Sequence, residues 1–180
     1  GDVYKRQIQT DERGKSYSLT ADYDSLHIDW NFIKNKYDLQ ESTDASESVS
    51  RLLYYCAVAA AAKFSPETTT GYVKPITMAL HKNFGYHPSI RYIRKNELSG
   101  VELQQLFYRE LEAKRPVLCC GLSHFFVCDG FADDYFHINW GWRGAMDGYF
   151  KLSVFGAKAD KLQIFDDVIA VSYTHLTLPT

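Results

Sequence analysis

The chain has 180 residues, of which 46% are hydrophobic and 23% are charged, and its formal net charge is −2. A globular chain of this length buries roughly 70% of the surface that its unfolded form exposes, so it needs no disulfide or metal in order to fold. The near-neutral charge argues against binding to nucleic acid or to an anionic membrane through a basic surface. No apolar run reaches the ~18 residues that a membrane-spanning helix needs.

The two ends of the chain differ in character from its middle. Residues 1–7 and 171–180 resemble translated sequencing-adaptor read-through, and such segments are excluded from reasoning about the fold. We therefore predict a non-native tail at each end and a native stretch over residues 8–170.

The first half of the native stretch is predicted to be mainly helical. Residues 16–20 alternate like a short strand, and residues 29–33 suit a short turn or helix. A capping box formed by Asp44 and Glu47 predicts the start of a long helix that ends near Phe64. Its buried face is expected to carry Val49, Leu52, Leu53, Cys56 and Ala60. A second helix has Pro75 in its first turn and ends near Gly85.

The second half changes from helix to strand. Residues 89–93 alternate like a strand, and residues 102–114 form an amphipathic helix with Leu103, Leu106, Phe107 and Leu111 on one face. After Pro116, strands are predicted over residues 117–120, 125–128, 135–140, 148–154 and 168–170. Helices followed by an antiparallel sheet predict an α+β fold.

The hairpin after residue 124 is the most informative place for chemistry. If its turn centres between Phe131 and Ala132, His124 faces Asn139 directly, with Cβ atoms roughly 4.5–5.5 Å apart. The amide could then accept the imidazole N–H and orient the ring, as the third member of a nucleophile–base–orienter set does. If the turn centres on residues 133–134 instead, His124 faces Arg143 and the orienting contact is lost. Geometry alone favours a histidine that is merely paired on a buried strand.

The four cysteines suggest neither a metal nor a nucleophile. His124 with Cys128 and either Cys119 or Cys120 matches no common zinc spacing, so no metal site is predicted. Cys56 lies about three turns into its helix among apolar neighbours. We interpret it as core packing, because helix N-terminal amides are too far away to lower the pKa of its thiol.

Three motifs follow one another between residues 123 and 150: Ser-His followed by an apolar strand and Asp-Gly, then His-Ile-Asn-Trp-Gly-Trp-Arg-Gly, then Asp-Gly-Tyr-Phe. Together they resemble the streptopain family of secreted, papain-like bacterial cysteine peptidases. Weaker similarity extends upstream to about residue 27. The family implies that His124 is the catalytic histidine, that Asn139 orients it and that Trp140 shields the pair. Trp142 and His137 are expected to hold the sheet and loop together.

Two departures from the family pattern matter. No segment before residue 56 resembles the family's Gln and Gly-Cys nucleophile region, so we expect residues 8–170 to be the C-terminal part of a peptidase domain, inactive alone. Ser123 replaces the usual glycine before the histidine, where the backbone lies close to substrate. The resemblance further implies a protein or peptide substrate, an extracellular location and possible inhibition by a propeptide, with no cofactor, nucleic acid or membrane partner.

Two other interpretations stay open. A non-catalytic papain-like module that binds protein or peptide would explain Ser123 and the missing nucleophile as real losses. An aromatic-rich domain that binds glycans is less favoured, because most of the 27 aromatic residues fall at core periodicity.

Overall fold

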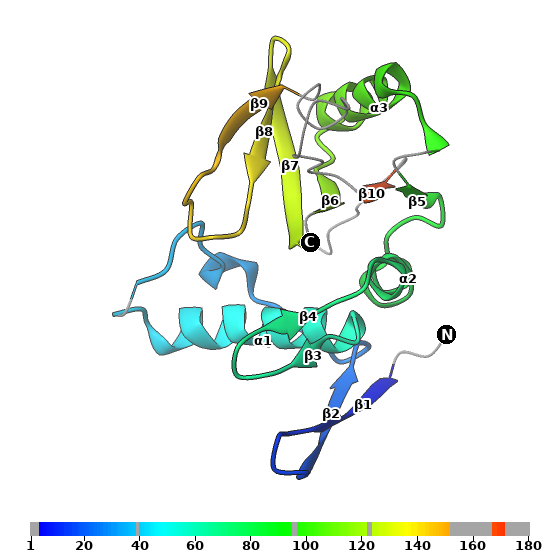
Figure 1. Ribbon diagram of the computed structural model, residues 1–180. Helices are drawn as coiled ribbons and strands as arrows, with labels where there is room; N and C mark the ends of the chain where they lie inside the picture. Colours follow the sequence, from blue (N-terminus) through cyan, green and yellow to red (C-terminus); the bar gives the residue numbers. More distant parts are fainter. Residues whose placement is uncertain (1–3, 39, 95–96, 122–123, 152–166, 172–180) are drawn as a thin grey trace. The chain divides into compact units, whose positions relative to one another are not determined.

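The computed structural model describes residues 4–38, 40–94, 97–121, 124–151 and 167–171 (Figure 1). The chain divides into two compact units, Gly1–Gly85 and Tyr86–Thr180. Each unit has its own buried cluster of apolar side chains. The mixed helix and antiparallel-sheet composition confirms the predicted α+β class.

The first unit packs two helices against a hairpin. Strands β1 (Tyr4–Thr10) and β2 (Ser16–Asp22) pair antiparallel, and η1 (Trp30–Phe32) is the short helix expected near residue 30. Helices α1 (Thr43–Ala59) and α2 (Val73–Phe84) follow, with the two-residue strands β3 (Lys63–Phe64) and β4 (Thr69–Thr70) between them. Strand β1 includes residues 4–7, which belong to the segment predicted to be a non-native tail. The pairing of β1 with β2 does not test where that segment comes from.

The long helix α1 differs from the prediction at both ends. Its N-cap is Ser42, whose hydroxyl accepts the N–H of Ala45 at 3.3 Å, so the predicted capping box at residues 44 and 47 is wrong. The Ser42 hydroxyl thus satisfies one free backbone donor, two residues before the position at which Asp44 was expected to cap the helix. At the other end the backbone turns at Ala61, with φ of 52°, before residues 63–64 enter a strand.

The predicted buried face of α1 is also partly wrong. Leu53 is 62% exposed and Cys56 is exposed, so Cys56 does not lie in the core. The helix buries Val58 and Ala59 instead, against Ala21 and Tyr23 of the first unit. The apolar stripe on α1 is wider than one packing face, and sequence periodicity did not reveal which side meets the hairpin.

Helix α2 ends as predicted. Gly85 is its C-cap with φ of 68°, and its N–H donates to the carbonyl of Leu80. This left-handed conformation costs an L-residue about 1–2 kcal/mol, and glycine avoids that cost.

Replacing Gly85 with alanine should therefore destabilise the chain by about 1 kcal/mol, because alanine adopts left-handed backbone only at a cost. Crowding does not contribute, since no heavy atom lies within 4 Å of the position of the new Cβ. Urea unfolding followed by circular dichroism measures the change. Gly85→Asn is the matched control, since asparagine tolerates left-handed backbone better than alanine does. Equal losses in the two variants would contradict this role of the cap.

The second unit is built on one six-stranded sheet, whose strand order is β5-β10-β6-β7-β8-β9. Its strands are β5 (Ile90–Arg94), β6 (Val117–Gly121), β7 (His124–Ala132), β8 (Tyr135–Asn139), β9 (Gly148–Lys151) and β10 (Asp167–Val171). Every neighbouring pair is antiparallel. The prediction that one strand continues to residue 154 concerns residues 152–154, which lie outside the described ranges.

Helix α3 (Gly100–Glu112) packs on strands β6 and β7 and contributes its apolar face to the unit's core (Figure 1). All four predicted apolar residues of this helix are buried, which confirms that face. Phe107 is fully buried and meets the ring of Phe136 edge to face at 5.7 Å. A capping box of Ser99 and Glu102, which was not predicted from the sequence, fixes the helix start.

A charged residue of α3 is also buried. Glu110 is fully buried, and its carboxylate accepts from Arg115 Nε at 2.7 Å and from Arg109 Nε at 3.3 Å. The Arg115 side chain is 20% exposed and that of Arg109 is 62% exposed. Arg115 is therefore the better shielded of the two partners, and a buried carboxylate depends on such a partner.

The β7–β8 hairpin has a different register from the predicted one. Its turn is formed by Asp133 and Asp134, and Asn139 lies opposite Val127 rather than His124. Two contacts favour this turn. Phe131 stays in its strand, packed on Tyr108 at 5.0 Å, and the Tyr108 hydroxyl donates to the carbonyl of Asp133 at 2.9 Å.

A bulge then shifts the register within the same hairpin. The pairing changes between Cys128 and Gly130, so Asp129 is an extra residue with no register partner on β8. This shift decides what lies beside the start of β7, where His124 stands.

Candidate active site around His124

His124 begins β7, opposite Gly121 of β6, and is half-buried. Its Nε2 lies 2.8 Å from the carbonyl oxygen of Trp140. A carbonyl oxygen can only accept a hydrogen bond, so Nε2 carries the proton and donates it. The other ring nitrogen, Nδ1, is then the acceptor in the neutral ring, which is the form that a general base needs.

An indole covers the face of the same imidazole. The rings of His124 and Trp142 lie 4.8 Å apart with an interplanar angle of 33°. Continuing the register beyond the bulge puts residue 142 beside residue 124, which agrees with this contact. The stacked indole restricts rotation of the imidazole and covers one of its faces.

Asn139 does not make the direct contact predicted for it. His124 and Val127 are three residues apart on one strand, so their side chains lie on opposite faces. Asn139, opposite Val127, lies on the face of Val127. Within the described part of the chain, the amide of Asn139 accepts the N–H of Gly141 at 2.9 Å and makes no hydrogen bond to His124.

The two residues are nevertheless joined through one peptide group. The carbonyl of Trp140 and the N–H of Gly141 belong to the same peptide plane. His124 Nε2–H donates to one end of that plane, and the other end donates to Asn139 Oδ1. Hydrogen bonds in a chain polarise one another, so Asn139 strengthens the acceptor that His124 uses.

Trp140 lies at the centre of this arrangement. It is 9% exposed, and its ring packs on Phe126 at 4.7 Å and on Trp142 at 5.6 Å, nearly parallel to the latter at 16°. Its backbone N–H donates to Asp147 Oδ1 at 2.8 Å. The indoles of Trp140 and Trp142 thus link the unit's core to the imidazole.

Three of the residues in this arrangement were predicted from the sequence, and the roles of two others were not. Trp142 was expected to hold the sheet and loop together, whereas it stacks on His124. Asp147 received no role, although it stands in the Asp-Gly motif that contributed to the resemblance. Ser123, the predicted substrate-binding residue, lies outside the described residues.

A second histidine of the sheet has a different setting. His137 Nδ1 lies 2.6 Å from Asp129 Oδ1 at the bulge, and its ring meets Tyr149 edge to face at 5.0 Å. This contact is consistent with the structural role predicted for His137.

Two of the cysteines in the second unit are poorly suited to nucleophilic attack. Cys119 and Cys128 are buried. Burial raises the pKa of the Cys128 thiol to about 12 and holds the pKa of the Cys119 thiol well above its usual range. A nucleophilic cysteine needs the opposite shift. In the first unit, desolvation also raises the pKa of the Cys56 thiol, although the residue is exposed.

The raised pKa values of these three thiols predict how fast each cysteine is alkylated. A raised pKa leaves less thiolate at a given pH, so at pH 8 Cys56 should react with iodoacetamide more slowly than glutathione does, and faster as the pH rises. Cys119 and Cys128 should react only after unfolding in urea, which serves as the control. Mass spectrometry of the tryptic peptides measures each site, and rapid native labelling of Cys128 would contradict the assignment.

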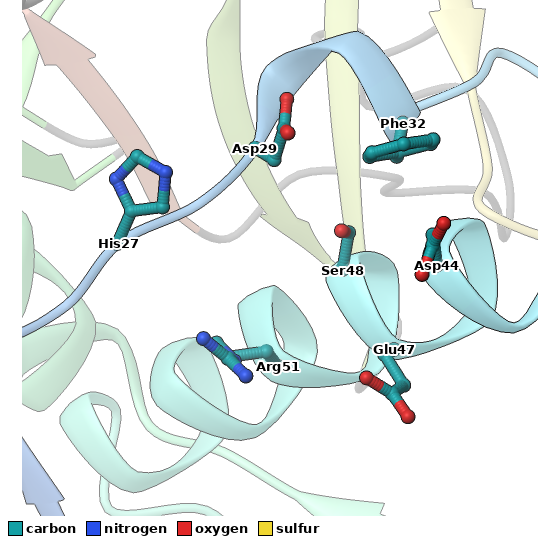
Figure 2. A pocket seen from close by; sticks show the side chains of 7 residues that line it. All are labelled: His27, Asp29, Phe32, Asp44, Glu47, Ser48 and Arg51. Carbon is teal, nitrogen blue, oxygen red and sulfur yellow. The ribbon is translucent and has the colours of Figure 1, made fainter.

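A shallow pocket lies in the first unit, beside the start of α1. Figure 2 shows Ser48 directed toward the η1 segment and Glu47 pointing away from it. The pocket is lined by His27, Asp29, Phe32, Asp44, Glu47, Ser48 and Arg51. Asp29 already accepts the N–H of Asn31 at 3.0 Å, so part of its carboxylate is used in capping η1.

Among the described residues, no group of three or more His, Cys, Asp or Glu side chains is arranged to hold a metal ion. Within the same ranges, no helix has the length and apolar character needed to cross a membrane.

Solved structures share the architecture of this chain. A fragment of prointerpain A from Prevotella intermedia aligns with a TM-score of 0.80 and 22% identity, covering 94% of this chain and 56% of that one. Active interpain A, a cysteine protease of the same organism, aligns with a TM-score of 0.78 and 21% identity, covering 95% and 74%. The chain therefore has the α+β fold of a papain-like cysteine protease.

Sequence comparison narrows this class. Streptopain from Streptococcus pyogenes is 29% identical over 148 residues, which are 79% of this chain and 37% of streptopain. The thiol protease/hemagglutinin PrtT from Porphyromonas gingivalis is 40% identical over 84 residues, or 44% of this chain and 10% of that protein. Residues 3–150 match the Peptidase C10 family, and the chain belongs to that family. It spans little more than a third of the length of the streptopains that it matches.

Proposed function

We propose that this chain supplies the histidine part of a cysteine endopeptidase active site, with His124 as the general acid and base. The observation that carries the proposal is the hydrogen bond from His124 Nε2–H to the carbonyl of Trp140, which leaves Nδ1 as the nitrogen that can face a thiol. The position of His124 in the family motif supports the same role.

In the proposed reaction, a thiolate attacks the scissile carbonyl while His124, protonated at Nδ1 as the partner of that thiolate, stabilises it. His124 then gives its proton to the leaving amine, and later helps water to release the acyl group. Asn139 orients the ring indirectly, through the peptide between residues 140 and 141. The indole of Trp140 shields that peptide from water, which strengthens its hydrogen bonds.

We propose that the nucleophilic cysteine lies outside these 180 residues. The raised pKa values of Cys56, Cys119 and Cys128 support this, because none of the three thiols is poised to ionise near neutral pH. The chain by itself is then inactive, and residues 8–170 are the C-terminal part of the peptidase domain.

The proposed substrates are proteins or peptides, and Ser123 is the proposed residue at the substrate-facing side of the histidine. By analogy with prointerpain A, whose name indicates a pro-form, a propeptide is a candidate inhibitor. We also propose secretion from a bacterial cell, as the family resemblance implies.

The test is to recover the coding sequence upstream of residue 8 and to express the full-length protein. Hydrolysis of a casein substrate that is abolished by a thiol-alkylating reagent supports the peptidase. An intact upstream reading frame that encodes no Gln and Gly-Cys segment would contradict the enzyme and favour the non-catalytic peptide-binding module. Hydrolysis that is insensitive to alkylation would rule out the cysteine mechanism.

A further inference from the structure

The loop that joins β8 to β9 is held in an unusual backbone shape. Four of its residues have positive φ, namely Gly141 (75°), Arg143 (58°), Gly144 (83°) and Met146 (64°). Left-handed backbone costs a residue other than glycine about 1–2 kcal/mol, so Arg143 and Met146 must be held there by the contacts of the loop.

A carboxylate closes this loop at its base. Asp147, the last residue before β9, accepts the N–H of Trp140, the first residue after β8, at 2.8 Å. Two backbone hydrogen bonds, from Ala145 to Trp142 at 3.0 Å and from Asp147 to Gly144 at 3.4 Å, lie inside the loop. The side chain of Asp147 joins the two ends of the loop.

Trp140 is consequently held on both sides. Its N–H donates to Asp147, and its carbonyl accepts from His124 Nε2–H. We propose that Asp147 is a positioning residue for His124, which acts by fixing the residue whose carbonyl orients the imidazole. This inference rests on the proposed function, since it assigns Asp147 to the same site.

A carboxylate suits this task for two reasons. A hydrogen bond to a charged acceptor is roughly twice as strong as one between neutral groups. Asp147 is also partly buried, whereas an exposed carboxylate would have water as a competing partner. Asparagine at this position would keep an acceptor of the same reach and lose the charge, whereas alanine would remove the acceptor.

The first experiment measures exchange of the His124 Nε2–H proton with water by NMR on the 180-residue chain. Asp147→Ala should speed this exchange about fivefold to tenfold, which corresponds to the loss of about one hydrogen bond, and Asp147→Asn should restore most of the protection. Exchange rates are compared under conditions in which the variants have the same free energy of unfolding, as measured by urea unfolding. Asp134→Ala is the matched control, since this exposed carboxylate lies in the β7–β8 turn and its loss should leave the His124 proton unchanged.

If the alanine variant does not fold, Asp147→Ser replaces it, because the shorter side chain moves the acceptor away from Trp140. A measurement on the unaltered chain adds a direct check. A scalar coupling across the hydrogen bond, from the Trp140 amide nitrogen to the Asp147 carboxyl carbon, is expected, and its absence overturns the inference.

In the full-length protein, Asp147→Ala should lower kcat about tenfold with little change in KM, and Asp147→Asn should recover most of the rate. Unchanged ring-proton exchange in Asp147→Ala overturns the inference even in an active peptidase. A full-length protein with no peptidase activity overturns the proposed function, and the exchange result is obtained independently of it.

Discussion

Replacing His124 with alanine in the full-length protein is expected to lower kcat/KM for peptide hydrolysis roughly 10²–10⁴-fold, because proton transfer to the leaving amine loses its donor. Alanine also removes the group that keeps the thiol ionised, so the loss should lie toward the upper end of that range. Steady-state hydrolysis of a fluorogenic peptide measures it.

The other residues of the site provide graded comparisons. Asn139→Ala should cost less, about tenfold, because the carbonyl of Trp140 still accepts from His124 when the amide is gone. His137→Ala is the matched control, a second histidine of the same sheet bonded to Asp129, and should keep most of the activity. Full activity in the His124 variant would refute the mechanism.

Replacing Arg115 with methionine is expected to destabilise the second unit by about 3–5 kcal/mol, because the fully buried Glu110 carboxylate loses its closer and better shielded partner. Urea unfolding followed by circular dichroism measures the change. Arg109→Met is the matched control. Its side chain is 62% exposed, so its pairing with the same carboxylate should contribute no more than about 1 kcal/mol.

A double variant separates the charge from the packing. Combining Glu110→Met with Arg115→Met removes both charges and should recover much of the stability that Arg115→Met alone loses, since an apolar pair of similar volume can replace a buried ion pair. A double variant that is less stable than Arg115→Met would show that Glu110 contributes through its shape or its hydrogen bonds beyond this pair.

The sequence predicted correctly those elements whose apolar residues allow only one assignment of the buried face. Helix α3 has a single apolar face, and all four residues predicted for it are buried. Strands β6 and β7 are apolar on both faces, and they lie inside the sheet. Helix α1 offered more apolar residues than one face can use, so periodicity alone predicted Leu53 and Cys56 as buried although both are exposed.

The site was harder to predict because it depends on register. The segment from Asp129 to Asp134 contains several residues that suit a turn, and short-range preferences do not rank them. The observed turn is favoured by Tyr108, which lies on α3 and is distant in sequence. A bulge is likewise set by the tertiary structure. The family motif pointed to Asn139 and Trp140, but counting residues could not show that His124 bonds the carbonyl of Trp140.

The bulge at Asp129 has a consequence for transferring residue roles between relatives. On one side of it, paired residue numbers on β7 and β8 sum to 266, and on the other side they sum to 267. If Asp129 paired regularly with Ile138 and made no bulge, the register of the turn would extend unchanged and bring His124 beside Arg143. With the bulge, His124 meets the indole of Trp142. A single-residue gap placed wrongly near Asp129 in a pairwise alignment would therefore exchange an aromatic neighbour for a cationic one.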